Sequence, residues 1–300
     1  MRIAITGSSG LIGSTLVRSL RSDRHEVLRL VRREPSGPGE VRWDPQGGTV
    51  DIAALEGVEA VVHLAGAGVG DHRWTDAYRR TIRDSRVRGT ATLARALASL
   101  DTPPRLLVSG SGITAYGDTG DRRVDEGAPL GTGFLASVCR DWEAAAEPAR
   151  DAGVRTAFAR TGLVVSGRGG AWGRLFPLFQ AGLGGRLGDG RQYWSFISLH
   201  DQIAALRHIV DTDSVSGPVN MCAPEALTNA EVTRAMGRVL RRPTVFAVPG
   251  PVLRAVVGEF ATEILGSTRA VPRVLLDSGF RWAHPGIDEA IRAALAEERH

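Results

Sequence analysis

The stretch Ile3-Ala4-Ile5-Thr6-Gly7-Ser8-Ser9-Gly10-Leu11-Ile12-Gly13 decides the fold. A short apolar run leads into three glycines spaced by three, and apolar residues then recur every three or four positions. This order predicts a strand, a tight turn and a helix. Glycine lets the backbone turn and approach a ligand closely, and a helix N-terminus attracts phosphate. We therefore predict a dinucleotide-binding turn, with an ordinary strand-to-helix turn as the alternative.

The length of 300 residues suits one large α/β domain, or one domain with a smaller lobe. No apolar run reaches the ~18 residues that a membrane span needs. The first predicted strand begins at Arg2, which leaves no room for a signal peptide. We expect a soluble, cytoplasmic protein that does not act at a membrane, with Cys139 and Cys222 as two buried thiols in a reducing compartment.

The basic residues are all arginine, because the sequence contains no lysine. The net charge is only +4, and the arginines are scattered rather than gathered in a basic block. This pattern argues against nucleic-acid binding. The seven histidines show no ligand spacing with acids or cysteines, so we predict no metal site.

Strand and helix patterns alternate through the first half of the chain. After the first strand, the predicted strands are Val27–Val31, Val41–Trp43, Ala60–Leu64, Arg105–Ser109 and Arg155–Arg160, and the longer helices cover Asp76–Leu100 and Phe134–Ala152. Repeated units of this kind predict an α/β fold, a Rossmann-type doubly wound parallel sheet with helices on both faces. Ligands of such sheets bind outside the carboxyl ends of the strands.

The composition changes after Thr161, where 166–190 is rich in glycine. We expect an NADP-binding domain over 1–165, with 196–220 returning to it, and a smaller substrate-side lobe from 166–195 and 221–300. The remaining predicted helices are Gln202–Val210, Asn229–Leu240 and Gly286–Leu295, with a short strand or extended segment at Pro243–Val248. A cleft between the two parts is the expected substrate site. Four aromatic residues either line that cleft or form the core of the lobe: Trp172, Phe176, Phe179 and Trp194.

The end of the second strand indicates which cofactor binds. An acid there accepts the ribose hydroxyl of NAD, whereas arginine suits the 2′-phosphate of NADP. The strand is followed by Arg32 and Arg33, while Glu34 comes late and beside a proline. Charge-assisted hydrogen bonds from the two arginines favour NADP, and a solvated surface charge is the alternative for either one.

Several motifs together resemble an atypical extended short-chain dehydrogenase/reductase over most of the chain. They are Gly7-x-x-Gly10-x-x-Gly13, His63-Leu64-Ala65-Gly66, Ser109-Gly110-Ser111 with Ala115-Tyr116-Gly117-Asp118, and Gly188-Asp189-Gly190 through His200-Asp201. More narrowly, the chain resembles a subgroup named after sugar-nucleotide epimerases, in the NAD-dependent epimerase/dehydratase family with a C-terminal domain of unknown function. Segments that carry this likeness include Arg73-Trp74-Thr75, Trp142-Glu143, Arg160-Thr161-Gly162 and 248–295.

The cofactor contacts come from the turn, the second strand and the resemblance. From the residues themselves we predict Gly7, Ser9, Gly10, Leu11, Ile12, Gly13, Arg32 and Arg33. The resemblance adds Leu64, Ala65, Gly66, Ser109 and Gly162. Arg86 stands where many relatives carry asparagine, and it is either an anion clamp for cofactor or substrate, or part of a structural ion pair.

The sequence departs from the family at the catalytic pair. The resemblance implies a tyrosine with a lysine four residues later, whose positions here hold Phe134 and Val138. The arginine that holds a substrate diphosphate in sugar-nucleotide enzymes is replaced by Trp194, with Arg191 three residues earlier. The name epimerase is therefore inherited from the family rather than inferred from these residues.

The remaining catalytic candidates are Ser111 and Tyr116. Ser111 either binds a carbonyl or alcohol oxygen or caps the strand end. Tyr116 is either the acid/base, with an arginine such as Arg86 lowering its pKa, or an anchor of its loop. His63 is predicted to be a packed histidine rather than a catalyst.

Two functions remain open from the sequence. The first is an NADP-dependent oxidoreductase or epimerase that acts on a small-molecule hydroxyl or carbonyl substrate. The second is a catalytically decayed NADP-binding sensor or scaffold protein. The resemblance also implies that the helices over 76–100 and 134–152 form the faces of a homodimer.

Overall fold

A computed structural model describes residues 1–297. Its centre is an eight-stranded sheet in the order β13-β8-β6-β5-β1-β2-β3-β4. All neighbouring strands are parallel except the last pair, β3 and β4. The strands are β1 (Arg2–Thr6), β2 (Glu26–Val31), β3 (Glu40–Asp44), β4 (Thr49–Val50), β5 (Ala60–His63), β6 (Leu106–Gly112), β8 (Arg155–Thr161) and β13 (Gly217–Met221). The predicted doubly wound parallel sheet is therefore confirmed.

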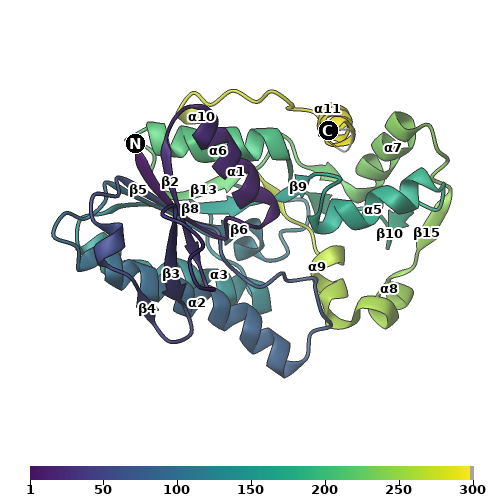
Figure 1. The fold of residues 1–300 in the computed structure, drawn as a ribbon. Coiled ribbons are helices and arrows are strands. Elements are labelled where there is room, and N and C mark those ends of the chain that lie inside the picture. Colours follow the sequence, from purple (N-terminus) through teal and green to yellow (C-terminus); the bar gives the residue numbers. More distant parts are fainter. Residues whose placement is uncertain (298–300) are drawn as a thin grey trace.

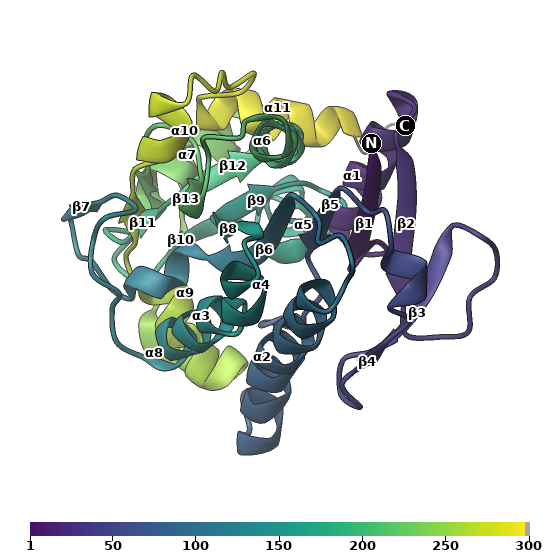
Figure 2. The ribbon, with the colours of Figure 1, turned by 90° about the vertical axis from the view of Figure 1, so that its left-hand side faces the viewer.

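Helices cover both faces of this sheet, as Figure 2 shows. One face carries α2 (Asp76–Ala98), α3 (Phe134–Ala144) and α4 (Glu147–Asp151), and the other carries α1 (Leu11–Ser22) and α6 (Leu199–Asp211). The prediction of a single helix over Phe134–Ala152 is wrong in one respect. The helix is interrupted at Ala145 and Ala146, and a new helix begins at Glu147 with Pro148 in its first turn. Proline is tolerated in a first turn, but its missing N–H breaks a helix interior.

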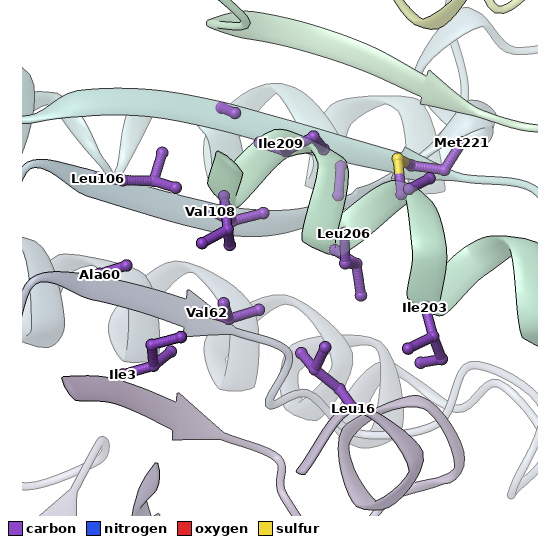
Figure 3. Packing of buried hydrophobic residues seen from close by; sticks show 14 of the residues in the cluster. Ile3, Leu16, Ala60, Val62, Leu106, Val108, Ile203, Leu206, Ile209 and Met221 are labelled. Atoms are coloured by element: carbon purple, nitrogen blue, oxygen red, sulfur yellow. The ribbon is translucent and has the colours of Figure 1, made fainter. Parts of the chain in front are cut away.

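The alternation of side chains along β1 builds the two cores. Ile3 and Ile5 point toward α1 and α6, whereas Ala4 belongs to the core under α2. Figure 3 shows Leu16 from α1 and Leu206 from α6 reaching toward Val62 and Val108 of the sheet. Each fully buried aliphatic side chain contributes about 1.5–3 kcal/mol to folding, so this packing holds the cofactor turn rigidly at the end of β1.

The second part of the chain lies at the other end of the molecule (Figure 1). It contains α5 (Gly170–Gln180), α7 (Asn229–Leu240), α8 (Gly250–Val257), α9 (Ala261–Leu265) and α11 (Ile287–Glu297). Helix α10 (Arg273–Asp277) lies instead beside the main sheet, where Leu275 belongs to the core under α1 and α6. Short paired strands join these helices: β7 (Arg123–Val124) with β16 (Arg269–Ala270), β9 (Leu163–Val165) with β12 (Phe196–Ser198), β10 (Gly185–Leu187) with β15 (Phe246–Val248), and β11 (Tyr193–Trp194) with β14 (Leu227–Thr228).

The aromatic residues left open by the sequence form the core of this part. Trp172, Phe176, Phe179 and Trp194 are all buried in one cluster with residues of α7 and α11. Trp172, Phe179 and Trp194 line only a small cavity of about 10 Å³, which is too small for a substrate. The two cysteines are free and buried, as expected. No helix of the described residues is both long and apolar enough to cross a membrane.

Candidate functional site

The glycine turn lies where the order of the sheet reverses. β1 has β2 on one side and β5 on the other, so the chain passes from one half of the sheet to the other beside the end of β1. Gly7 has a φ of +66°, and a Cβ there would meet the Leu64 backbone at 2.8 Å. A Cβ on Gly13 would lie 2.2 Å from the Gly7 carbonyl oxygen. Both positions require glycine, because strand, turn and helix pack backbone to backbone.

The start of α1 supplies donors for an anion. Ser14 donates the first intrahelical hydrogen bond, to the Gly10 carbonyl at 2.9 Å. The N–H groups of Leu11, Ile12 and Gly13 precede that bond and point out of the helix start. Gly10 and Ser9 are exposed beside them. A Cβ on Gly10 would have only the Gly7 carbonyl oxygen near it, at 3.4 Å, so the space in front of the turn is open.

The arginines after β2 have different surroundings. Arg33 forms two hydrogen bonds to Glu40, of 2.7 and 2.6 Å, and so lowers the pKa of that carboxyl to about 2. Glu34 is paired with Arg42. Arg32 is exposed and forms no ion pair within residues 1–297. Arg33 is thus held by Glu40, whereas Arg32 has no acidic partner among the described residues. That both arginines hold a phosphate stays a prediction.

The loop after β5 is tied to the end of β1. The Thr6 hydroxyl accepts hydrogen bonds from the N–H groups of Leu64 and Ala65, at 3.1 and 3.2 Å. Its own proton therefore points to His63 Nδ1, 2.7 Å away. His63 is completely buried, and burial, aided by the charge of Arg86, lowers its pKa to about 4. The expectation of a packed histidine is confirmed.

Arg86 lies beneath this loop. Its guanidinium donates to the carbonyls of Ala67 and Ile82, at 2.9 and 3.1 Å, and lies 5.1 Å from the centre of the Trp142 ring. A Cβ on Gly66 would lie 3.3 Å from the guanidinium carbon of Arg86. Burial lowers the pKa of Arg86, and no carboxylate of the described residues pairs with it. The ion-pair alternative therefore finds no partner here.

Ser111, at the carboxyl end of β6, belongs to a buried polar network. Its hydroxyl donates to Glu143 of α3 at 2.7 Å. Arg160 of β8 donates to both oxygens of the same carboxylate, each at 2.8 Å. Burial opposes the charge of Arg160, but Glu143 outweighs it and raises the Arg160 pKa. The Glu143 carboxylate is thus held by Arg160 and accepts the hydrogen bond of the Ser111 hydroxyl.

Tyr116 is an anchor rather than an accessible phenol. Its hydroxyl donates to Asn220 at 2.8 Å and accepts from Arg160 at 2.9 Å. The side chain is only 2% exposed, and burial raises its pKa. The Asn220 amide in turn donates to the Val271 carbonyl at 2.9 Å. We therefore replace the predicted acid/base role of Tyr116 with one in joining β6, β8 and β13.

Two residues carried over from the resemblance are also held within the protein. The Ser109 hydroxyl is fully buried and bonded to the Gly110 carbonyl at 3.3 Å. Gly162 donates its N–H to the Met221 carbonyl, and a Cβ there would lie 2.6 Å from the Ser195 carbonyl oxygen. Both contacts are explained by packing, so a direct cofactor contact stays a prediction for these two.

The positions of the family's catalytic pair are apolar. The Phe134 ring contacts Trp74 edge-on, with 5.0 Å between centroids, and Trp74 also contacts Phe260 at 5.5 Å. Val138 is 1% exposed, in a cluster with Ile82. Neither position can exchange a proton with a substrate.

Sequence reasoning missed three members of the polar network: Glu143, Arg160 and Asn220. Glu143 and Arg160 stand in the segments Trp142-Glu143 and Arg160-Thr161-Gly162, which carry the subgroup resemblance. Their buried charges were the available signal, because a carboxylate and a guanidinium within predicted elements of a core need each other as partners.

The absence of a metal site stays a prediction, but the fold brings together three residues of ligand type. His200, Asp201 and His284 each place a ligand atom within 4.8 Å of the others. His284 is 83 positions from Asp201 in the sequence, so local spacing could not reveal this group.

Comparison with known proteins agrees with this geometry. The model of the NAD dependent epimerase/dehydratase family matches residues 3–222. The chain belongs to this family. A second model, a domain of unknown function named DUF1731, matches residues 248–294 of this epimerase/dehydratase family member.

Relatives match this family member over nearly all of the given sequence. It is 47% identical over 290 residues to "Epimerase family protein MT2273" of Mycobacterium tuberculosis, covering 96% of each chain. The solved structure of human epimerase family protein SDR39U1 with NADPH superposes with a TM-score of 0.91, at 31% identity and 99% coverage of both chains. The solved structure of a nucleoside-diphosphate sugar epimerase from Corynebacterium glutamicum superposes with a TM-score of 0.83, at 36% identity. The match covers 99% of this chain and 58% of that one.

Proposed function

We propose that the chain binds NADP(H) and acts as an oxidoreductase or epimerase on a small hydroxyl or carbonyl substrate. The observation that carries the proposal is the position of Ser111, two residues beyond the Ser109 position that pairs with the end of β5. Its hydroxyl faces the Glu143 carboxylate at 2.7 Å. A polarised hydroxyl at the carboxyl ends of the central strands lies on the side of the sheet where ligands bind.

The choice of NADP(H) over NAD(H) rests on the edge of β2. Glu40, the buried acid nearest that edge, is occupied by Arg33 and also lies 2.7 Å from Arg29. Glu34 is paired with Arg42. Among the residues that the structure describes, both acids at this edge are therefore paired with arginine, while Arg32 is available for a 2′-phosphate. The human relative that was solved with NADPH supports the same choice.

The remaining cofactor contacts follow from the same turn. The N–H groups of Leu11, Ile12 and Gly13 would hold the pyrophosphate at the helix start. The open face at Gly10 lets the phosphates approach the backbone. Arg86, which has carbonyl partners and an aromatic neighbour, adds a positive charge beneath Gly66 for a phosphate or an anionic substrate group.

The bound nicotinamide would supply the acceptor or donor of a hydride. Because the Ser111 proton points to Glu143, the Ser111 oxygen offers its lone pairs to a substrate hydroxyl. In the oxidative direction, the substrate hydroxyl proton would pass to Ser111 as the Ser111 proton passes to Glu143. Reduction reverses both transfers. This relay replaces the proton exchange that a tyrosine and lysine perform elsewhere.

Cofactor binding is tested by titrating the purified protein with NADPH and NADH and following cofactor fluorescence. We expect tighter binding of NADPH, a loss of that preference in Arg32→Gln, and no change in Arg88→Gln. Arg88 is the matched control because it is an exposed arginine on α2, 60% exposed as a side chain. Equal affinity for the two cofactors in the wild type would overturn the proposal for NADP(H).

Turnover is tested separately with a panel of aldehydes, ketones and sugar nucleotides, by following NADPH oxidation. Turnover of at least one carbonyl class is the expected result. A protein that binds NADPH tightly but oxidises it with no member of the panel would overturn the enzyme assignment. It would support the sensor or scaffold hypothesis instead.

A further inference from the structure

Three potential metal ligands meet where α6 begins. Asp201 and His200 lie in its first turn, and His284 lies in the segment that leads to α11. His200 Nδ1 is 3.4 Å from Asp201 Oδ1, and His284 Nδ1 is 3.9 Å from Asp201 Oδ2. The two imidazole rings are 5.3 Å apart at their centres. None of these residues belongs to the Ser111 network or to the glycine turn.

The carboxylate of this group is fixed in place. Asp201 is 1% exposed, and its two oxygens accept hydrogen bonds from the N–H groups of Ala283 and His284, at 2.8 and 2.9 Å. Its own N–H donates to the Ser198 hydroxyl at 3.0 Å. Hydrogen bonds of this kind orient ligating carboxylates in metal proteins. Each oxygen keeps a further lone pair for a cation.

The imidazoles are accessible to an ion from solvent. The side chain of His200 is 60% exposed and that of His284 is 25% exposed. His284 Nδ1 also contacts the Ser198 hydroxyl at 3.1 Å, a contact that ligation would replace. Small rotations of two side chains at the surface are enough to bring the nitrogens toward Asp201, since the carboxylate stays in place.

The Glu297 carboxyl lies in the same region and accepts a hydrogen bond from Ser166 at 3.2 Å. Burial raises the pKa of Glu297, and the nearby Arg168, His200 and His284 oppose that shift only in part. A cation between the imidazoles would therefore lie near two carboxylates.

We propose that His200, Asp201 and His284 form a binding site for a late first-row divalent cation, with Zn²⁺ as the favoured ion. Two imidazole nitrogens and one carboxylate oxygen are a ligand set that Zn²⁺ accepts, with about 2.0–2.2 Å to each atom. Hard ions such as Mg²⁺ and Ca²⁺ prefer sites made only of oxygen atoms. Three protein ligands leave a fourth position for water.

The site would join distant parts of the chain. Asp201 opens a helix that packs on the main sheet, and His284 precedes the last described helix, so a bound ion links them without contacting the cofactor turn. An ion that binds the folded state alone stabilises it. The ion is expected to raise the melting temperature rather than to take part in the hydride chemistry.

The experiment uses the full chain without a polyhistidine tag, freed of metal by chelation. Zn²⁺ is titrated in competition with a chromophoric chelator, and the melting temperature is recorded with and without Zn²⁺. We expect one equivalent to bind and to raise the melting temperature. His200→Ala and His284→Ala should each weaken binding by about tenfold or more, and His72→Ala, an exposed histidine elsewhere, should not.

The melting temperatures without metal show whether each variant is folded. His200 is the more exposed of the two, so His200→Ala decides the outcome if His284→Ala unfolds. The proposal is overturned if the wild type binds Zn²⁺ no more tightly than the His200 variant, or if all three variants lose affinity equally. NADPH titration of the same samples tests the proposed function separately, because the three ligands lie outside the glycine turn.

Discussion

Ser111 Oγ lies 2.7 Å from Glu143 Oε1, and this hydrogen bond joins the end of β6 to α3. Two positions earlier on the same strand, the Ser109 hydroxyl donates to the Gly110 carbonyl. The two serines can therefore be compared directly, because one hydroxyl bonds to a side-chain carboxylate and the other to the neighbouring backbone.

Ser111→Ala should lower NADPH-dependent turnover by about a hundredfold, because the hydroxyl that exchanges the proton is lost. Ser109→Ala should leave turnover unchanged. Steady-state rates per folded molecule, with the carbonyl compound found active, check both. Equal rates for Ser111→Ala and the wild type would remove Ser111 from the mechanism.

Glu143→Gln should destabilise the protein by about 3 kcal/mol, because it leaves the buried Arg160 charge without a counterion. The two side chains are only 11% and 4% exposed. Asp141→Asn is the control on the same helix, since its partner Arg83 is half-exposed and the pair is worth less than about 1 kcal/mol. Urea unfolding of both variants measures the difference, and equal losses would contradict a buried ion pair as its cause.

Tyr116→Phe separates an anchor from a catalyst. Removing the hydroxyl leaves Asn220 Oδ1 without its donor and deprives Arg160 of an acceptor, at a cost of about 1–3 kcal/mol. Turnover per folded molecule should stay unchanged. The same unfolding and rate measurements apply, and a stable variant without turnover would restore Tyr116 as the acid/base.

The sequence predicted best what neighbouring residues determine. The path from Ile3 to Gly13 was predicted correctly, because its apolar run, glycines and helical spacing act locally. Strand β13 was missed, because Gly217-Pro218 is a poor strand start and only the parallel pairing with β8 supplies its conformation. Most of the short strands after Thr161 were missed for a similar reason, although β15 lies within the segment predicted at Pro243–Val248.

The candidate site shows the same difference between what the local sequence indicates and what only the fold brings together. Ser111 was found from its motif, but Glu143 and Arg160 approach it from other elements, 32 and 49 positions along the chain. Arg33 was assigned to a phosphate because the turn that brings Glu40 back to it cannot be read from charge alone. Residue type indicated the chemistry, whereas pairing across elements decided which charges were available.

The glycine turn offers a second matched pair, Gly10 and Gly13. Gly13→Ala should cost about 3 kcal/mol or more, because its Cβ would lie 2.2 Å from the Gly7 carbonyl oxygen and backbone must move. Gly10→Ala should cost less than about 1 kcal/mol but should weaken NADPH binding, because its methyl group enters the open space. Unfolding and cofactor titration check both, and unchanged affinity in Gly10→Ala would move the phosphates away from this turn.

His63 should make the protein less stable in mild acid. Burial, aided by Arg86, lowers its pKa to about 4 in the folded state, against about 6.5 in an unfolded chain. The unfolded state therefore binds the extra proton first as the pH falls below about 6.5, and stability declines until the folded pKa is reached. The full loss is about 3 kcal/mol, of which about 2 kcal/mol has occurred by pH 5.

Urea unfolding between pH 8 and pH 5 measures this loss of stability. His63→Asn keeps an acceptor for Thr6 but cannot take up a proton, so its stability should vary less with pH by that amount; parallel curves for the two proteins would show that another group is responsible.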